Sequence, residues 1–320
     1  MNTITLVLTA LLVAASSYAQ EVRLFPLPSN TSQDEFAPST TNHGRTLFFT
    51  REVRGKGQRL TSKQRSSDGW TSDDLVRGDV NDATHAGSAA LTPDGQMMIF
   101  AAYEHDARSL GRTDLYIARL QNGKWKDVTN LGPSVNTDAY DSQPTLSADG
   151  RTLYFVSDRP GGQGGTDIYT SSFDGSNWSK AVPLSGVNSS SDEMSPTIAA
   201  DGTTLYFGSN RPGGQGGFDI FVGKVSAGAV RDIKPMAAPI NTSADELFYM
   251  GVPNSDQAFV SRMNASGDWD NFSVVPNPFP SNPVTLVEGM VKNKLSGAPV
   301  GANITITDLT TGKRVANMRS

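Results

Sequence analysis

Short apolar runs recur along the chain, and each follows a polar turn. Leu153-Tyr154-Phe155 comes three residues after Asp149-Gly150, and Leu205-Tyr206-Phe207 comes three residues after Asp201-Gly202. An Asp-Gly pair before an apolar run predicts a hairpin, because glycine tolerates the positive φ of the tight turn. No stretch longer than a turn has helical periodicity. The pattern therefore predicts an all-β fold.

The turns belong to a repeat of roughly fifty residues. Residues 140–155 and 192–207 match closely, 88–100 form a third copy, and 34–49 form a looser fourth. The turn glycines are 51, 55 and 52 residues apart: Gly44, Gly95, Gly150 and Gly202. Each copy continues through a polar loop, a third strand and a turn; in three copies the third strand begins with an aspartate, and in three copies a tryptophan follows the turn. The aspartates are Asp114, Asp167 and Asp219, and the tryptophans are Trp70, Trp125 and Trp178.

Four antiparallel strands per repeat predict the blade of a β-propeller. A degenerate fifth unit runs from Asp245 to about Trp269, without the Asp-Gly turn. Residues 22–28 resemble the fourth strand of a blade, so we expect them to complete the last blade and close the ring. We expect five blades over residues 20–280, with four or six as alternatives.

Two motifs carry a family resemblance. One is Pro-x-x-(Ser/Ala)-x-Asp-Gly-x-x-Leu-Tyr-Phe, and the other is Arg-Pro-Gly-Gly-x-Gly-Gly-x-Asp-Ile-(Tyr/Phe), which begins at Arg159 and again at Arg211. Over residues 34–272 the chain resembles TolB-type, WD-like propeller repeats found in OmpA-family and related cell-envelope proteins of Bacteroidetes-type bacteria. The resemblance implies a periplasmic or outer-membrane-associated propeller used for protein contacts, and it implies no reaction.

Residues 284–320 resemble the opening strands of a carboxypeptidase regulatory-like (transthyretin-like) sandwich. The resemblance rests on 287–291, 296–308 and Thr311-Gly312-Lys313. About half of a sandwich of ordinary size is present, so we expect a partial sandwich. Such modules often follow these propellers and precede a peptidoglycan-binding OmpA-like domain. The resemblance therefore implies contact with peptidoglycan only through a domain absent from this chain.

Residues 1–19 predict export. The apolar run 4–15 is interrupted only by Thr5 and Thr9, and Ser17-Tyr18-Ala19 fits the pattern before a cleavage site. A short membrane anchor is the alternative, but the run is too short to span a bilayer comfortably. We expect a cleaved signal peptide and a location in the periplasm or at the outer membrane.

Composition removes several classes of function. The formal net charge of −5 comes without the basic stripe of a nucleic-acid binder. The absence of cysteine excludes disulfides and thiolate metal sites. His43, His85 and His105 lack metal-ligand spacing, and we expect no metal and no cofactor. The Gly-rich loops precede strands rather than helices, which argues against phosphate binding, and no Gly-x-Ser-x-Gly elbow marks a peptidase.

The candidate binding residues lie in the loops that enter the first strand or join the second and third strands of a blade. Loops on a rigid scaffold are the usual place of binding. This rim would carry Asp141, Asp158, Arg159, Asp192, Glu193, Asn210 and Arg211. The alternative, which we favour, is that Arg159 and Arg211 pair with neighbouring carboxylates and brace the ring.

Other repeated residues have structural interpretations. Asp114, Asp167 and Asp219 recur in successive blades, which favours capping of their own loops over catalysis. Gly95, Gly150 and Gly202 form the turns, and we expect Trp125 and Trp178 to pack between blades.

Three functions follow from the sequence. The leading one is a non-enzymatic interaction or scaffold module of the cell envelope, with other envelope proteins as partners. The second is a carbohydrate-active or carbohydrate-binding propeller, which needs two carboxylates about 5–10 Å apart at the channel mouth for catalysis. The third is a structural spacer for a distal wall-binding domain.

Overall fold

A computed structural model of the chain describes residues 21–41, 44–67 and 69–283, together with short segments between 292 and 319. The chain divides into two units, and Glu21–Val284 form the first. The second unit includes Thr285–Ser320. Each unit is considered by itself.

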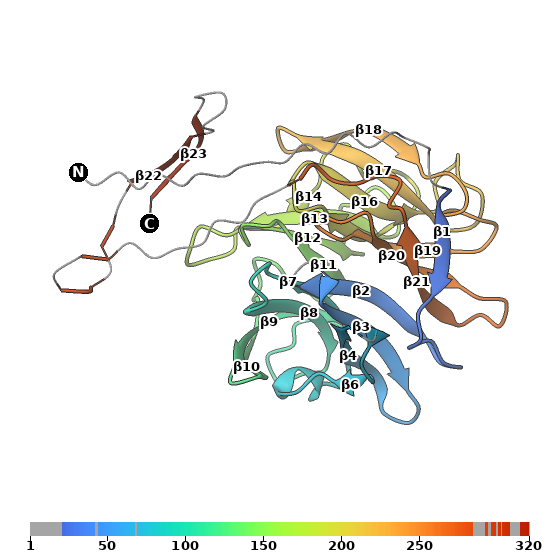
Figure 1. The fold of residues 1–320 in the computed structure, drawn as a ribbon, viewed down its shortest axis with the longest axis horizontal. Helices are drawn as coiled ribbons and strands as arrows, with labels where there is room; N and C mark the ends of the chain where they lie inside the picture. The colour runs from blue at the N-terminus through green and yellow to red at the C-terminus, as the bar shows by residue number, and fades with distance from the viewer. Residues whose placement is uncertain are drawn as a thin grey trace. The chain divides into compact units, whose positions relative to one another are not determined.

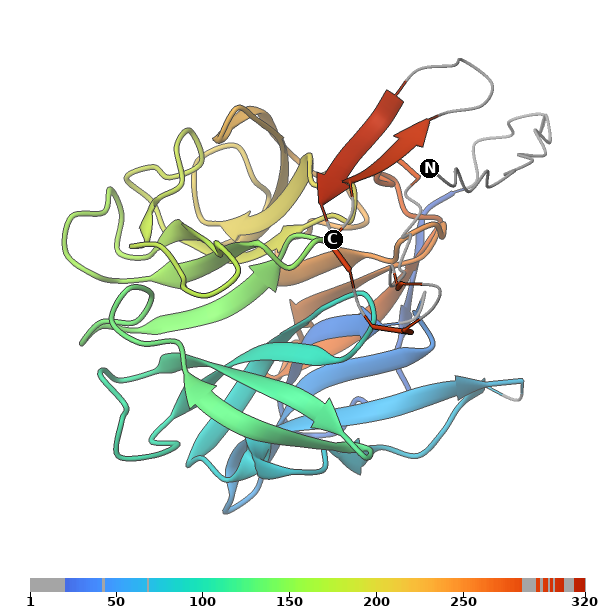
Figure 2. The same ribbon diagram turned by 90° about the vertical axis from the view of Figure 1, so that its left-hand side faces the viewer.

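The first unit consists of five antiparallel sheets that follow one another in chain order (Figures 1 and 2). The first blade comprises β2 (Glu35–Thr41), β3 (Thr46–Val53), β4 (Gly57–Ser66) and β6 (Asp74–Leu75), with β5 (Gly69–Trp70) paired to the end of β4. A 3-10 turn, η2 (Asp79–Asn81), precedes the second blade, which comprises β7 (His85–Leu91), β8 (Met97–Tyr103), β9 (Asp114–Gln121) and β10 (Lys124–Asn130).

The third blade comprises β11 (Asp141–Leu146), β12 (Thr152–Ser157), β13 (Asp167–Ser172) and β14 (Val182–Pro183). The fourth comprises β15 (Glu193–Ile198), β16 (Thr204–Ser209), β17 (Asp219–Ser226) and β18 (Ala229–Pro235). The fifth comprises β19 (Glu246–Gly251), β20 (Ala258–Met263), β21 (Trp269–Val275) and β1 (Arg23–Pro26). The prediction of an all-β propeller with five four-stranded blades is confirmed.

The N-terminal strand closes the ring, as the sequence predicts. In Figure 1, β1 runs alongside β21, and Arg23 pairs with Val275 while Pro26 pairs with Phe272. Leu27 continues the ladder, because its N–H donates to the carbonyl of Asn271 at 2.9 Å. The last blade is therefore made from both ends of the propeller sequence, which joins the first and last repeats without a covalent link.

The first strands of the blades form the inner ring, and each carries a bulge. The bulge residues all have positive φ: Ala37, Ser88, Gln143, Ser195 and Phe248. In the last two, the bulged N–H donates to the side chain of the preceding bulge residue, from Ser195 to Gln143 Oε1 at 2.6 Å and from Phe248 to Ser195 Oγ at 3.0 Å. The bulges turn backbone donors sideways, so that neighbouring blades are linked near the axis.

The apolar core lies between blades. Phe207 and Leu205 of the fourth blade pack with Tyr154 and Ile168 of the third in one buried cluster. Trp125, 4% exposed, packs edge-on against Phe48 of the first blade, with 6.4 Å between ring centroids. Trp178 is partly buried against the cluster shared by the second and third blades. Each sheet thus covers its apolar faces with its neighbours.

The hairpin turns have the expected conformation. Gly95, Gly150 and Gly202 have φ between +66° and +68°. The preceding aspartate caps the turn, and Asp149 Oδ1 accepts the N–H of Arg151 at 3.0 Å.

The described part of the second unit contains a hairpin of β22 (Asn303–Thr307) and β23 (Arg314–Arg319). The predicted strand at 287–291 lies outside the described residues, as does the predicted signal peptide, so both stay predictions. No helix in the described part of the chain has the length and apolar character needed to cross a membrane.

Candidate functional site: the loop rim

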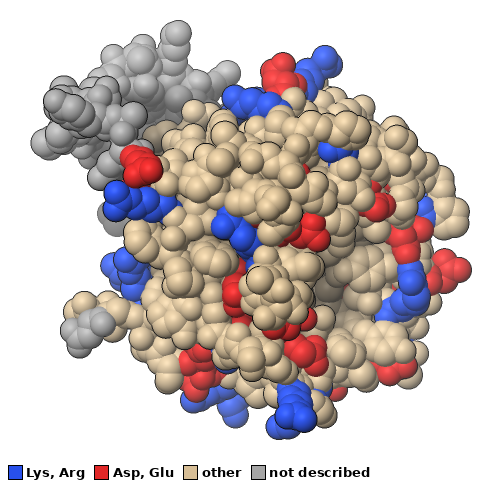
Figure 3. Space-filling view, turned by 90° about the vertical axis from the view of Figure 1, so that its right-hand side faces the viewer, with Lys and Arg blue, Asp and Glu red and all other residues tan. Residues whose placement is uncertain are grey.

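The loops that enter the first strands and those that join the second and third strands emerge on one side of the propeller, because the strands alternate in direction. We call these loops the rim. Five of the seven candidate residues lie in it, namely Asp158, Arg159, Asp192, Asn210 and Arg211, and the other two, Asp141 and Glu193, begin β11 and β15 next to it. Figure 3, which shows one face of the molecule, has acidic and basic side chains intermixed over the described surface. No broad patch of a single charge appears on the described atoms of that face.

Asp141 and Arg159 form a buried ion pair. Arg159 Nη2 lies 2.5 Å from Asp141 Oδ1, and the aspartate side chain is 0% exposed. The same nitrogen donates to the carbonyl of Val135 at 2.7 Å, in the loop entering the blade, and Nε donates to Ser157 Oγ at 2.8 Å. The guanidinium stacks 4.6 Å from the ring centroid of Tyr169. Arg159 therefore links two loops and a strand of its blade.

Glu193 and Arg211 repeat this arrangement in the fourth blade. Arg211 Nη2 lies 2.8 Å from Glu193 Oε1 and also donates to the carbonyl of Val187. Its guanidinium lies 4.9 Å from the ring centroid of Phe207. The glutamate accepts two further bonds from Ser189, through the backbone N–H and the hydroxyl.

The first and fifth blades carry the same pair with the arginine on the second strand itself. Arg51 Nε lies 2.8 Å from Glu35, and Arg262 Nε lies 2.7 Å from Glu246. Both glutamates are 0% exposed. Burial raises the pKa of both carboxyls, against the lowering effect of the bonds from the arginine and a nearby threonine. Four blades thus hold a buried carboxylate against an arginine, which we call the brace.

The remaining candidates connect loops to one another. Asp192 Oδ1 accepts the N–H of Thr166 from the preceding blade at 2.9 Å, and Asn210 Oδ1 accepts the N–H of Asp192 at 2.8 Å. Asp158 accepts the N–H of Tyr140 and pairs with Arg112 of the second blade. These side chains hold the seams between blades and are more exposed than the brace carboxylates.

The glycines of the Arg-Pro-Gly-Gly-x-Gly-Gly loop allow the loop to lie on the next blade. A Cβ on Gly164 would lie 1.8 Å from the carbonyl oxygen of Ser191, and one on Gly216 would lie 2.1 Å from that of Ala244. The N–H of Gly164 donates to Asp167 Oδ2 at 3.2 Å, as Gly216 does to Asp219 at 3.0 Å. In the second blade, Asp114 accepts the N–H groups of Leu110 and Gly111. These aspartates cap the loops that precede their own strands.

The second blade departs from the brace pattern. Ala86 lies two residues before its bulge residue Ser88, where Asp141 precedes Gln143 in the third blade. His105 takes the place of the arginine, and its Nε2–H donates to the carbonyl of Asp79 at 2.9 Å.

Five asparagines that the sequence analysis does not single out have the same structural role, which is to pair with the backbone of a third strand. Asn136 Oδ1 accepts the N–H of Leu115, and its Nδ2 donates to the carbonyl of the same residue, both at 2.9 Å. The side-chain amide thereby extends the ladder of a third strand. The equivalent residues make the same pair of bonds: Asn30, Asn81, Asn188 and Asn241. A signal was present, because an asparagine stands five residues before each brace carboxylate.

Metal-binding groups are not assembled in the described part of the chain, where no three His, Asp or Glu side chains come together in a way that suits an ion. His85 Nδ1 accepts the N–H of Gln58 at 3.2 Å. His43 lies outside the described residues.

Comparison with known proteins defines the fold. No family model and no curated protein matches the chain. The structure of a BT0996 RGII complex is similar over 82% of this chain and 92% of that protein, with a TM-score of 0.55 and 11% identity. A glycoside hydrolase covers the same shares with a TM-score of 0.53 and 12% identity. The putative TolB from Agrobacterium tumefaciens is 16% identical over 80% of this chain and 90% of that protein, with a TM-score of 0.49. Likeness at these identities shows the fold alone: the chain contains a five-bladed β-propeller.

Proposed function

We propose that the chain is an exported, non-enzymatic propeller that acts as an interaction or scaffold module of the cell envelope. The observation that carries this proposal is that the buried carboxylates at the rim are paired with arginines within the fold. The brace carboxylates Asp141 and Glu193 are 0% exposed and held by arginine. A general acid or base must reach the proton it transfers, and these groups are turned inward.

The rim also has the rigidity expected of a binding platform. Its loops are bonded to the next blade, as from Thr166 to Asp192 and from Phe218 to Asp245. A preorganised surface loses little conformational entropy when a protein partner binds. Exposed side chains of the same loops, such as Gln163 and Gln215, are then available for contacts.

The envelope location and the OmpA-type association rest on the sequence. The motifs around Arg159 and Arg211 resemble TolB-type repeats of envelope proteins, and residues 1–19 have the pattern of a signal peptide. In this proposal, peptidoglycan is reached through a domain beyond the present chain, and the propeller holds another envelope protein.

The experiment is chemical crosslinking of the purified protein to envelope fractions, with identification of the crosslinked peptides. Because the chain has no cysteine, a thiol-directed crosslinker reacts only where a cysteine is introduced. We expect adducts from Asn210→Cys on the rim, and none above background from Val182→Cys at the outer edge of the third blade. Equal labelling of the two positions would contradict an interaction rim.

The second candidate, a carbohydrate-active propeller, makes a different demand. Two accessible carboxylates must face each other at the channel mouth. Asp158 and Asp192 are the more exposed acids among the candidates, and both accept backbone bonds. Turnover of a glycan that is abolished by Asp158→Asn or Asp192→Asn, with the fold intact, would establish this function instead.

A further inference from the structure

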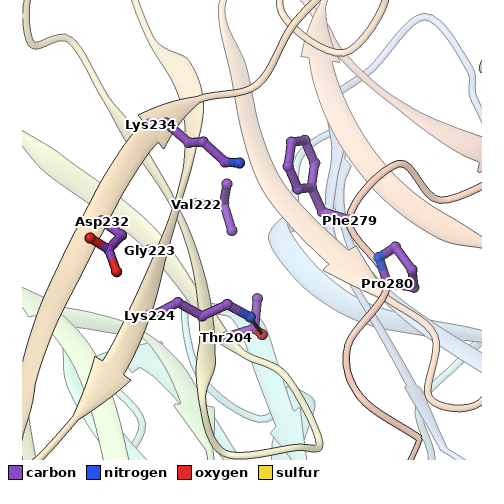
Figure 4. A pocket seen from close by; sticks show the side chains of 8 residues that line it. All are labelled: Thr204, Val222, Gly223, Lys224, Asp232, Lys234, Phe279 and Pro280. Atoms are coloured by element: carbon purple, nitrogen blue, oxygen red, sulfur yellow. Dashed lines mark hydrogen bonds between the residues drawn. The ribbon is translucent and has the colours of Figure 1, made fainter.

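A cavity of about 240 Å³ lies between the fourth blade and the segment that follows β21 (Figure 4). Its lining comes from β16, β17 and β18 and from the segment that follows β21: Thr204, Val222, Gly223, Lys224, Asp232, Lys234, Phe279 and Pro280. Figure 4 shows the lysine side chains reaching from the strands, with Phe279 and Pro280 on the opposite wall.

The opposite wall is held in place by buried hydroxyls. We call residues 276–283 the strap. Tyr206 Oη donates to the carbonyl of Phe279 at 2.5 Å, and Tyr249 Oη donates to Asn277 Oδ1 at 2.6 Å. The same Asn277 oxygen accepts the N–H of Phe279 at 2.9 Å. Because both tyrosines are 0% exposed, the position of Phe279 is set by the core rather than by solvent-exposed contacts.

Thr204 places a short side chain in the lining of the cavity. Thr204 begins β16 and pairs with Lys224, as Met97 begins β8 and pairs with Arg119 in the second blade. The larger Met97 packs against the apolar cluster between the second and third blades. In the fourth blade Thr204 lines a hollow that the strap covers on one side.

The cavity lining carries two lysines, and Asp201 lies beside it, where its Oδ2 accepts a hydrogen bond from Thr204 Oγ1 at 3.0 Å. Lys224 Nζ donates to Thr204 Oγ1 at 2.7 Å, and Lys234 Nζ lies 5.0 Å from the ring centroid of Phe279. Among the described residues, no salt bridge involves either lysine. Asp232 is the single acid in the lining. The site therefore offers two ammonium groups, an aromatic face and an apolar floor.

We propose that this cavity binds a small ligand through a carboxylate. The carboxylate lies between the Lys224 and Lys234 ammonium groups, and the body of the ligand packs on Phe279 and Val222. The volume is below the roughly 300–1,000 Å³ of sites for drug-sized ligands. It suits one amino-acid residue or one sugar ring, so the carboxylate belongs either to the C-terminal residue of a peptide or to a uronic sugar.

This site is separate from the rim. Thr204 follows the Asp201-Gly202 turn, which joins the first and second strands at the end of the blade opposite the rim. A failure of ligand binding here therefore leaves the proposed interaction rim untouched, and the reverse also holds.

The test is titration of the full chain with N-acetyl-L-alanine and, separately, with glucuronate. Binding is measured by calorimetry and by NMR chemical shifts. The neutral amide N-acetyl-L-alaninamide is the matched probe without charge. We expect saturable binding of at least one acid and binding of the amide at least about tenfold weaker, because the amide lacks the negative charge that strengthens hydrogen bonds to the two ammonium groups. The tighter of the two acids identifies the source of the carboxylate.

Variants locate the binding. Lys224→Gln and Lys234→Gln are each expected to weaken the acid about three- to tenfold, since these lysines are exposed and the interaction is screened. Lys124→Gln, at an exposed lysine of β10, is the control and leaves the affinity unchanged. Absence of binding by both acids at about 20 mM, equal affinity for acid and amide, or equal loss in the control variant would overturn the proposal.

Discussion

The ring of His105 lies 4.9 Å from the ring of Tyr116, where the next two blades hold an arginine against the equivalent aromatic. Arg159 stacks on Tyr169 at 4.6 Å and Arg211 on Phe221 at 5.4 Å. The histidine keeps the stacking and the bond to a carbonyl of the entering loop, but Ala86 stands in place of the carboxylate. A blade therefore tolerates loss of the brace when both charges are removed together.

His105→Ala is expected to lower the free energy of unfolding by about 1–3 kcal/mol, because it removes a stacked ring and a partly buried hydrogen bond. Chemical denaturation of the variant and the wild type measures the difference. Arg108→Ala, at an exposed arginine of the same loop, is the control and changes stability by less than about 0.5 kcal/mol. Equal effects would mean that His105 does not substitute for the brace.

Arg211→Met is expected to cost about 3–5 kcal/mol, because it leaves Glu193 buried without its partner. Adding Glu193→Gln should recover part of this loss, since the uncompensated charge is then gone. Denaturation of the two single variants and the double variant forms the cycle. Arg231→Met, on the exposed face of β18, serves as the control. Additive losses would contradict a coupled pair.

Gly164→Ala is expected to destabilise the propeller by about 3 kcal/mol, because the new Cβ meets the carbonyl of Ser191 and backbone must move. Gly161→Ala is the matched variant in the same loop. Gly161 has φ of +99° with open space around it, so its cost is about 1 kcal/mol of backbone strain. Thermal unfolding temperatures compare the two variants. A larger loss of stability for Gly161→Ala than for Gly164→Ala would show that the loop does not lie on the next blade.

Ring closure by β1 is tested at two neighbouring side chains. Leu27 is 5% exposed and packs with Leu47 and Phe259, whereas Phe25 is 51% exposed. Leu27→Ala is expected to cost about 2–5 kcal/mol, and Phe25→Ala less than about 0.5 kcal/mol. Denaturant midpoints measure both, and a small loss at Leu27 would mean that the N-terminal segment adds little to the closed ring.

Asp201 makes attachment of the strap sensitive to acid. Burial alone would raise its pKa, but the N–H groups of Thr203, Asn282 and Thr204 together hold the pKa below the ordinary 3.8. Because the pKa is lower in the folded state, the Asp201 carboxylate stabilises that state fully above pH 3.8. This stabilisation is lost as the pH falls through the lower pKa of the folded state. Hydrogen exchange of the Asn282 N–H should therefore rise, after correction for its intrinsic rate, below pH 3.8. Asp201→Asn should remove this dependence, and an unchanged profile would contradict the assignment.

The blade architecture was accessible from the sequence because it repeats. The Asp-Gly turns at Gly150 and Gly202 fix hairpins by local chemistry, and the similarity of residues 22–28 to a fourth strand was enough to predict the closing strand. The fifth blade lacks these turns, but its sheet still forms because its neighbours cover its faces.

The roles of the rim residues were harder to predict from the sequence, because they depend on contacts between loops. The sequence placed Asp141 and Arg159 together on the rim and favoured bracing over ligand binding as their role. It did not distinguish Asp141, which is 0% exposed, from Asp158, whose side chain is 27% exposed. The pairs Glu35–Arg51 and Glu246–Arg262 lack the sequence motif of the other two pairs, because their arginines lie on strands rather than at the start of an Arg-Pro-Gly-Gly loop. The cavity depends on the strap, which has no counterpart in the repeat.

The most direct test of the interaction rim is photocrosslinking in living cells, with a photoreactive amino acid placed at Asn210 or Gln163 on the rim, or at Val182 on the outer edge of the third blade. The account predicts that both rim positions give a discrete adduct with the same envelope protein and that Val182, 52% exposed, gives none. Adducts of equal yield from all three positions, or none from either rim position, would contradict the proposal that the rim is where this propeller holds its partner.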